Sequence, residues 1–154
     1  MATMYDAVDW WQIPRDAAYI AAYSNGEFAA DFAALAKTYP KAWVFHIDVL
    51  GTDPDAGIKD IETGDITVGS VRSVVMERAD KHPGFLIRLY CNLSTWPGVK
   101  AEVAGLSNEV QRNIRYWIAN PFTPAHIAPG SSATQYNWGR TYDTSEILTR
   151  FIQP

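Results

Sequence analysis

Short apolar segments alternate along the chain with amphipathic ones, a pattern typical of strands and helices that follow one another. The segments predicted to be strands are residues 5–9, 18–23, 42–50, 58–62, 85–90 and 115–119, with further extended pieces between 125 and 138. Apolar residues recur at helical spacing in residues 27–39, 67–81 and 99–113. The last apolar segment, residues 144–151, is compatible with a short strand or a helix.

Strands separated by helices favour an α/β fold with parallel strands and right-handed crossovers. About eight extended segments fit a barrel as well as an open sheet, although the connections are short and no helix fits between the first two strands. No internal repeat, low-complexity run or linker interrupts the sequence, so residues 1–154 are expected to form one domain.

The most informative polar feature is the acidic pair of Asp60 and Glu62, at the end of a predicted strand. Alternate strand residues point the same way, so the two carboxyl groups should share one face, with Cα atoms about 6.5–7 Å apart. Their repulsion raises the pKa of at least one of them. A glycosidase needs one protonated and one ionised carboxyl group. The alternative is a solvated strand end or a helix cap.

Two further charged residues bear on this pair. Asp48 falls within the apolar run 43–50, so it is expected at the site-facing end of that strand, as a third pocket acid. Lys59 precedes the pair directly, and by alternation its side chain should point away from it. An ammonium group close to the pair would instead lower the carboxyl pKa values and weaken an acid.

Aromatic residues gather beside polar ones near the predicted strand ends. The clusters are Asp9-Trp10-Trp11-Gln12, Ser94-Thr95-Trp96 and Gln135-Tyr136-Asn137-Trp138. Such rings serve either for packing or as flat apolar faces for sugar rings. We therefore treat Trp10 and Trp96 as candidate sugar-binding residues.

Composition and charge narrow the function classes. With 47% hydrophobic and 19% charged residues, the chain is typical of globular proteins. A net charge of −4 argues against a nucleic-acid partner and a polybasic membrane anchor. Neither a membrane-spanning apolar run nor a signal peptide is apparent. The three histidines lack metal-ligand spacing and Cys91 lacks an evident histidine partner, so no metal, cofactor or thiol nucleophile is expected.

In their order along the chain, these segments resemble the lysozymes of glycoside hydrolase family 25, and more closely their small actinobacterial and phage relatives. The resemblance covers almost the whole sequence, although each motif is weak alone. The segments that carry it are Tyr5-Asp6-Ala7-Val8, Asp60-Ile61-Glu62, residues 89–96, residues 116–119, Thr134-Gln135-Tyr136 and Tyr142-Asp143.

The resemblance implies an irregular, reduced (β/α) barrel with fewer than eight helices. It also implies cleavage of the β-1,4 bond after N-acetylmuramic acid in peptidoglycan, without a cofactor. Glu62 would be the general acid, and Asp60 would stabilise positive charge at the sugar or orient its 2-acetamido group. Asp6 and Asp143 would shape the pocket. Three aromatic residues would flank the sugar, namely Tyr90, Trp117 and Tyr136.

Departures from the family leave other functions open. Thr134 stands where the family usually has tryptophan, and the residues after Asp143 differ as well. A barrel that has lost elements can keep only glycan binding or a structural role in a phage particle, and a hydrolase of another polysaccharide is a third reading. A larger assembly or homo-oligomer would supply avidity for a polymer. The resemblance implies a phage of an actinobacterium as the source, with the host cytoplasm before lysis or the particle as the location.

Overall fold

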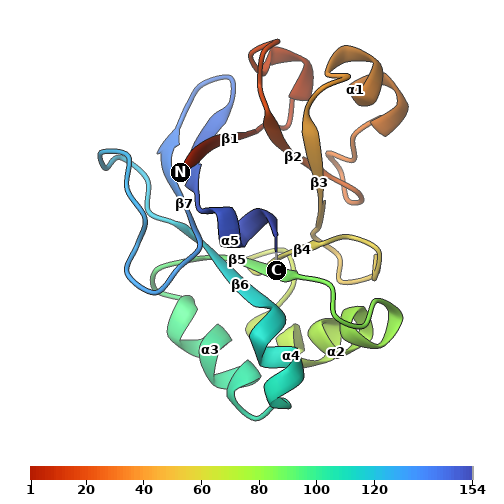
Figure 1. Ribbon diagram of the computed structural model, residues 1–154, viewed down its shortest axis with the longest axis vertical. Coiled ribbons are helices and arrows are strands. Elements are labelled where there is room, and N and C mark those ends of the chain that lie inside the picture. Colours follow the sequence, from red (N-terminus) through yellow and green to blue (C-terminus); the bar gives the residue numbers. More distant parts are fainter. Residues whose placement is uncertain (154) are drawn as a thin grey trace.

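The computed structural model describes residues 1–153, and its eight strands form a closed barrel (Figure 1). The strands are β1 (Ala2–Asp6), β2 (Tyr19–Tyr23), β3 (Trp43–Asp48), β4 (Ile58–Asp60), β5 (Ile87–Asn92), β6 (Ile114–Ala119), β7 (Ala133–Trp138) and β8 (Asp143–Ile147). Neighbours from β1 to β7 are parallel, as expected, whereas β8 runs antiparallel to both β7 and β1 and closes the barrel. The predicted reduced (β/α) barrel is confirmed.

Helices follow only some of the strands. They are α1 (Phe32–Thr38), α2 (Val71–Lys81), α3 (Trp96–Ala104), α4 (Asn108–Asn113) and α5 (Thr149–Ile152), with the 3-10 helices η1 (Trp10–Gln12) and η2 (Val68–Ser70). As predicted, β1 and β2 are joined without an α-helix, because only η1 lies between them. No helix within residues 1–153 has the length and apolarity needed to cross a membrane.

Several predicted element boundaries are wrong. The first predicted helix begins at Phe32 rather than at residue 27, because Asp31 caps it, and the strand predicted over residues 58–62 ends at Asp60. The helix expected over residues 99–113 is two helices, because α3 ends at Gly105 and Ser107 begins α4 by accepting a hydrogen bond from the N–H of Val110. The first strand covers residues 2–6 rather than 5–9, because it pairs with β8 from Ala2 onward.

The amino ends of the strands are filled by apolar side chains that point into the barrel. They include Met4, Ala21, Phe45, Ile58, Trp117, Ala133 and Ile147. Helix α5 adds the fully buried Phe151, whose ring lies 5.6 Å from that of Phe45 and 6.3 Å from that of Trp117. The barrel is therefore a packed core at this end, and any cavity inside the barrel must lie toward the carboxyl ends.

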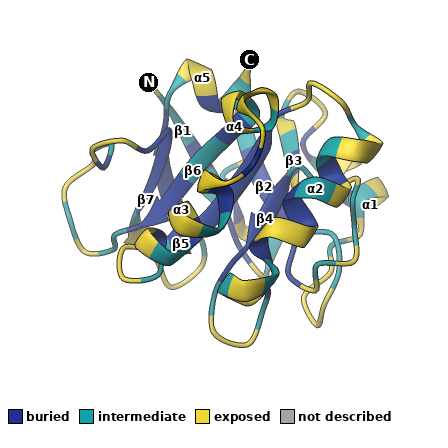
Figure 2. Ribbon diagram, turned by 90° about the horizontal axis from the view of Figure 1, so that it is seen from below, coloured by how far each residue is buried: buried dark blue, intermediate teal, exposed yellow. Residues whose placement is uncertain are grey.

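Two further apolar clusters lie outside the barrel. One packs α2 and α3 against β5 and β6, and the other packs η1 and α1 against β2 and β3. The strands are mostly buried, whereas the outer faces of the helices are exposed (Figure 2). Because both faces of these strands are covered, the carboxyl-end loops rest on a rigid frame.

Candidate active site

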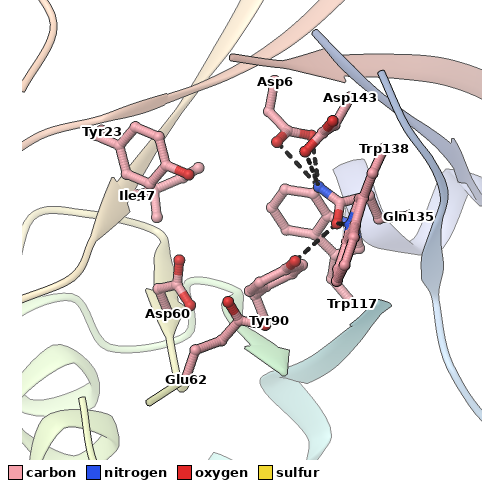
Figure 3. A pocket seen from close by; sticks show the side chains of 10 residues that line it. All are labelled: Asp6, Tyr23, Ile47, Asp60, Glu62, Tyr90, Trp117, Gln135, Trp138 and Asp143. Atoms are coloured by element: carbon pink, nitrogen blue, oxygen red, sulfur yellow. Dashed lines mark hydrogen bonds between the residues drawn. The ribbon is translucent and has the colours of Figure 1, made fainter. Parts of the chain in front are cut away.

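A cavity of about 150 Å³ opens at the carboxyl ends of the parallel strands (Figure 3). The side chains that line it come from every strand of the barrel, with one more just beyond β4. They are Asp6, Tyr23, Ile47, Asp60, Glu62, Tyr90, Trp117, Gln135, Trp138 and Asp143. This end of a (β/α) barrel is where active sites are generally built.

One wall of the cavity carries the acidic pair. Asp60 is the last residue of β4 and only 5% exposed, and its Oδ1 has no hydrogen-bond partner within residues 1–153. Glu62 lines the same cavity from the turn that follows. That turn is closed by the N–H of Ile66, which donates to the carbonyl of Asp60 at 3.2 Å. Strand alternation, continued for two residues past the strand, thus brings both carboxyl groups to one face.

The acidic pair is held in its protonated form more strongly than ordinary carboxyl groups. Burial raises the pKa of Asp60 to about 8, and repulsion from Glu62, Asp65 and Asp6 adds to this effect. Burial and the charge of Asp65 also raise the pKa of Glu62. Among the residues that line the cavity there is no lysine, arginine or histidine to offset the negative charge. The cavity can therefore keep a proton donor near neutral pH.

The opposite wall carries a second pair of acids, Asp6 and Asp143, which are register partners of β1 and β8. Burial raises the pKa of Asp6 to about 8, and the nearby Asp143 adds to this, whereas a hydrogen bond from Gln135 opposes it. Burial also raises the pKa of Asp143, against a hydrogen bond from the N–H of Gly139. The cavity is thus acidic on both sides.

Gln135 connects the second acidic pair to the aromatic side chains. Its Nε2 donates to Asp6 Oδ1 at 3.0 Å and to Asp143 Oδ2 at 3.4 Å. Its Oε1 accepts from the Tyr90 hydroxyl at 2.7 Å and from Trp138 Nε1 at 2.6 Å. Because the indole N–H can only donate, the amide oxygen must face Trp138 and the amide nitrogen must face the acids. All four neighbours are therefore held by one amide.

Six of the residues predicted from the sequence meet in this cavity. They are Asp6, Asp60, Glu62, Tyr90, Trp117 and Asp143. The rings of Tyr90 and Trp117 lie 4.5 Å apart between centroids. Their proximity is an observation, whereas the catalytic and sugar-binding roles assigned to them stay predictions.

Three predicted sugar-binding aromatics lie outside the cavity. Tyr136 follows Gln135 on β7, so alternation turns it to the outer side of the barrel. Trp10 lies in η1 and packs against the apolar cluster of α1. Trp96 begins α3 and is buried against Tyr116, with 5.6 Å between the ring centroids. Local sequence placed these rings near strand ends without fixing the direction of their side chains.

The placement predicted for Asp48 is wrong. This residue ends β3, but its carboxylate forms an ion pair with the buried ammonium of Lys59 at 2.6 Å, and neither residue lines the cavity. Because β3 and β4 pair with Asp48 opposite Lys59, the two side chains share the outer face of the barrel. Lys59 thus points away from Asp60, as alternation predicts.

Four residues that line the cavity were given no role of their own from the sequence, namely Tyr23, Ile47, Gln135 and Trp138, although Gln135 and Trp138 belong to a predicted aromatic cluster. Alternation along each strand could have selected Gln135 once an inward neighbour was known. Trp138 is 45% exposed, and its ring lies 5.8 Å from that of Phe122, which is 80% exposed. Phe122 has a φ of 62°, a left-handed conformation that costs free energy in a residue other than glycine. The sequence indicates Trp138 as part of an aromatic cluster, but its pairing with Phe122 depends on the fold.

Together with Asp65, the acidic pair offers a set of oxygen ligands for a cation. Carboxyl oxygens of Asp60, Glu62 and Asp65 lie within 4.8 Å of one another. Oxygen ligands of this kind suit hard divalent cations such as Ca²⁺ and Mg²⁺. The sequence-based expectation that the protein works without a metal stays a prediction.

Comparisons with known proteins agree with the architecture. Neither the scan of protein-family models nor the search of curated proteins gives a match. Among solved structures, the chain is similar to a bacterial lysozyme from Streptomyces coelicolor, with a TM-score of 0.59 and 14% sequence identity. The similarity covers 95% of this chain and 91% of that lysozyme, so both have the same fold over nearly their whole lengths.

Proposed function

We propose that this protein is a glycoside hydrolase that cleaves the glycan strands of peptidoglycan. The observation that carries the proposal is the pair of Asp60 and Glu62, two carboxyl groups on one wall of a cavity at the carboxyl end of the barrel. Most glycosidases use two carboxyl groups that flank the glycosidic bond to be cleaved. The choice of substrate is supported by the shared fold with a bacterial lysozyme.

In the proposed mechanism, Glu62 is the general acid. It donates its proton to the glycosidic oxygen as the bond to the anomeric carbon breaks. In the free protein, the pKa of about 8 keeps the proton of the pair on Asp60, so the mechanism requires this proton to pass to Glu62 when the glycan binds. Asp60, ionised by that transfer, stabilises the positive charge that develops at that carbon. Because the two groups interact, they titrate as a pair, and a single proton shared between them supplies both the acid and the anion. Glu62 then accepts a proton from the water that completes hydrolysis.

The spacing of the pair favours retention of configuration. Oxygens of Asp60 and Glu62 lie within 4.8 Å of each other. Inversion needs room for a water molecule between the carboxyl groups, about 6.5–9.5 Å, whereas retention uses groups about 5–5.5 Å apart. We expect the first product to keep the β configuration, which NMR spectroscopy of the fresh hydrolysate would detect.

The deciding experiment measures the release of reducing ends from purified peptidoglycan. We expect release by the unmodified protein and a loss of about a thousandfold in Glu62→Gln, because general acid catalysis contributes about 10²–10⁴-fold. Glu77→Gln, an exposed site on α2, is the matched control and should keep full activity. Wild-type turnover by Glu62→Gln would refute the assignment of the acid. Folded protein that binds peptidoglycan without releasing reducing ends would replace the proposal by a glycan-binding barrel.

A further inference from the structure

A cavity of about 410 Å³ opens on the surface at the amino ends of the strands, opposite the candidate active site. Its walls come from α2, the loop that joins α2 to β5, the first residues of β3 and β5, and the end of α5. The apolar side chains that line this amino-end cavity are Trp43, Phe45, Phe85, Leu86 and Ile152. Small-molecule sites are typically cavities of about 300–1,000 Å³ with apolar and aromatic walls and a few polar groups. The amino-end cavity has the size and the walls of such a site.

Arg88 lies at the floor of the amino-end cavity and points into the barrel. It is 7% exposed, and by alternation along β5 it shares the inward face with Tyr90. Its guanidinium carbon lies 4.8 Å from the ring centroid of Phe45 and 5.2 Å from that of Phe151. Burying a cation among apolar side chains costs free energy unless a partner offsets the charge. The partners of Arg88 therefore decide what this end of the barrel can bind.

Within residues 1–153, the hydrogen-bond partners of Arg88 are uncharged. Its Nε donates to the carbonyl oxygen of Phe151 at 2.6 Å, and its Nη2 donates to that of Ile152 at 3.2 Å. In the same part of the chain, Nη1 makes no hydrogen bond and no carboxylate pairs with the group. Burial, with the charges of Arg78 and Arg115, lowers the pKa of Arg88 to about 10, so it is still a cation at pH 7. The two carbonyl groups solvate this charge but do not neutralise it.

Arg78 brings a second guanidinium group to the same place. A Cβ atom on Gly57 would lie 3.2 Å from Arg88 Nη1 and 4.0 Å from Arg78 Nη2, so the two groups reach one point beside the cavity. Arg78 is also 7% exposed, and its Nη1 donates to the carbonyl oxygens of Pro54 and Asp55. Its Nε is buried without a hydrogen-bond partner within residues 1–153. Both arginines thus have donors that this part of the chain does not use.

No acid in the walls of the cavity offsets the two arginines. Among the described residues that line it, none is an aspartate or a glutamate. The carboxylate of Asp55 is already engaged, by Lys81 at 2.8 Å and by His82 at 2.6 Å. Two buried guanidinium groups therefore converge on an apolar cavity in a protein whose net charge is −4. An anion with an apolar body would complement both the charge and the walls.

We propose that the amino-end cavity binds a small aromatic carboxylate, with its carboxylate on Arg88 and Arg78 and its ring against Trp43 and Phe85. The planar fork of an arginine matches the two oxygens of a carboxylate. Trp43 is 55% exposed and Phe85 is 61% exposed, so both rings have area to give to an aromatic ligand. Because the site is at the other end of the barrel from Asp60, the inference goes beyond the proposed function and does not depend on it.

A matched pair of small molecules tests the requirement for charge. 1-Naphthoate and 1-naphthamide share one ring system and nearly one shape, but only the naphthoate is an anion at pH 7. We expect isothermal titration to give a Kd of about 1 mM or lower for naphthoate, the affinity usual for a ligand of this size. The naphthamide should bind about tenfold more weakly, the difference that one hydrogen bond to a charged group supplies. Added salt should weaken only the binding of naphthoate. Equal affinities, or no binding of naphthoate, would overturn the proposal.

Arginine variants assign the preference for naphthoate to the two guanidinium groups. Arg88→Gln should lose the tenfold preference, and Arg78→Gln should reduce it. Arg112→Gln, which makes the same change at an exposed site on α4, should keep it. Circular dichroism establishes that each variant is folded, which matters because Arg88 also holds the carbonyl group of Phe151. An unchanged preference in either folded variant of the cavity would refute the assignment.

Phe85→Ala tests the aromatic wall without disturbing the core, because this side chain is 61% exposed. It should weaken the binding of naphthoate and naphthamide alike by about fivefold, the loss expected for one aromatic contact. Phe28→Ala, at a site that is 48% exposed before α1, is the matched control and should bind both as the unmodified protein does. Unchanged affinities in Phe85→Ala would place the ligands elsewhere and overturn the proposal, while the release of reducing ends from peptidoglycan would still test the glycosidase function separately.

Discussion

Asp48 and Asp60 end neighbouring strands, β3 and β4, and both are buried, yet their surroundings are opposite. Burial alone would raise the pKa of Asp48, but hydrogen bonds from Lys59 and Asn25 outweigh it and lower the pKa. The backbone N–H groups of residues 50–53 also donate to this carboxylate. Asp60 has an unpartnered oxygen, and its pKa is raised to about 8.

The difference follows from the side of the barrel on which each carboxyl group lies. On the outer side, Asp48 is ionised, fully paired, and organises the loop after β3. On the inner side, Asp60 faces a cavity without cations, and its hydrogen-bonding capacity is left for a ligand. Buried polar groups are generally satisfied in folded proteins, so an unsatisfied one in a cavity indicates function.

The largest effect is expected from breaking the outer ion pair. Lys59→Met removes the ammonium that Asp48 contacts at 2.6 Å and leaves a buried carboxylate without its counter-charge. The free energy of unfolding should fall by about 3–5 kcal/mol, the usual result of removing one partner of a buried pair. Urea unfolding at pH 7 measures this loss.

Lys37→Met makes the same chemical change at an exposed site of α1 and should alter the free energy of unfolding by less than about 0.5 kcal/mol. The pKa of Asp48 in Lys59→Met, followed by NMR, should rise toward that of Asp60. Equal stabilities of the two lysine variants would show that the pair contributes nothing to folding.

Asp60→Asn should have the opposite effect on stability. Because the pKa of Asp60 in the folded protein is above its unfolded value, the folded state binds this proton more tightly. The stability gained from that proton is complete below about pH 4 and is lost as the pH rises to about 8. The free energy of unfolding of Asp60→Asn should exceed that of the unmodified protein by an amount that grows across this window, to at least about 2 kcal/mol at pH 9.

Urea unfolding of both proteins from pH 4 to pH 9 checks this prediction. Asp80→Asn, at an exposed position of α2, should follow the unmodified protein at every pH. A constant difference between Asp60→Asn and the unmodified protein would mean that Asp60 is not held protonated. Hydrolysis of peptidoglycan should be lost in Asp60→Asn, because the amide cannot stabilise the positive charge.

Gln135→Leu removes the amide group that donates hydrogen bonds to both Asp6 and Asp143, the second pair of acids in the cavity. The Tyr90 hydroxyl and Trp138 Nε1 would lose their acceptor, and Asp6 would lose its hydrogen bond. We expect a loss of about 2 kcal/mol in the free energy of unfolding, since unsatisfied buried groups cost about 1–3 kcal/mol. The pKa of Asp6 should rise further, which NMR titration would show. An unchanged pKa would contradict the role given to the Gln135 amide.

The smallest effect is expected at the rim of the cavity. Phe122→Gly places glycine at a φ of 62°, so the free energy of unfolding should rise by up to about 1 kcal/mol as the backbone strain is relieved. Binding of a glycan should weaken at the same time, because the exposed ring beside Trp138 is lost. Thermal unfolding and isothermal titration measure the two changes. Unchanged glycan affinity would show that this ring does not contact the glycan.

Much of the fold could be predicted because the alternation of apolar segments is a local property. The pairing of β8 could not, because antiparallel closure depends on contacts between the two ends of the chain. Asp60 and Glu62 could be selected because strand spacing alone brings them to one face. Alternation could place Gln135 on the inward face, but its importance could not be predicted, because it arises from partners on three other strands.

By itself, the sequence determined the order of strands and helices, the reduced set of helices and the common face of the acidic pair, since these follow from backbone periodicity. Only the tertiary structure decided which aspartates face the cavity and which face outward, because closure of the barrel sets the direction of each strand end. It also placed Arg88 beside Phe45 and Phe151 and left Trp10, Trp96 and Tyr136 outside the cavity. The local pattern decides which side chains share one face of a strand, and long-range packing decides whether that face lines the cavity.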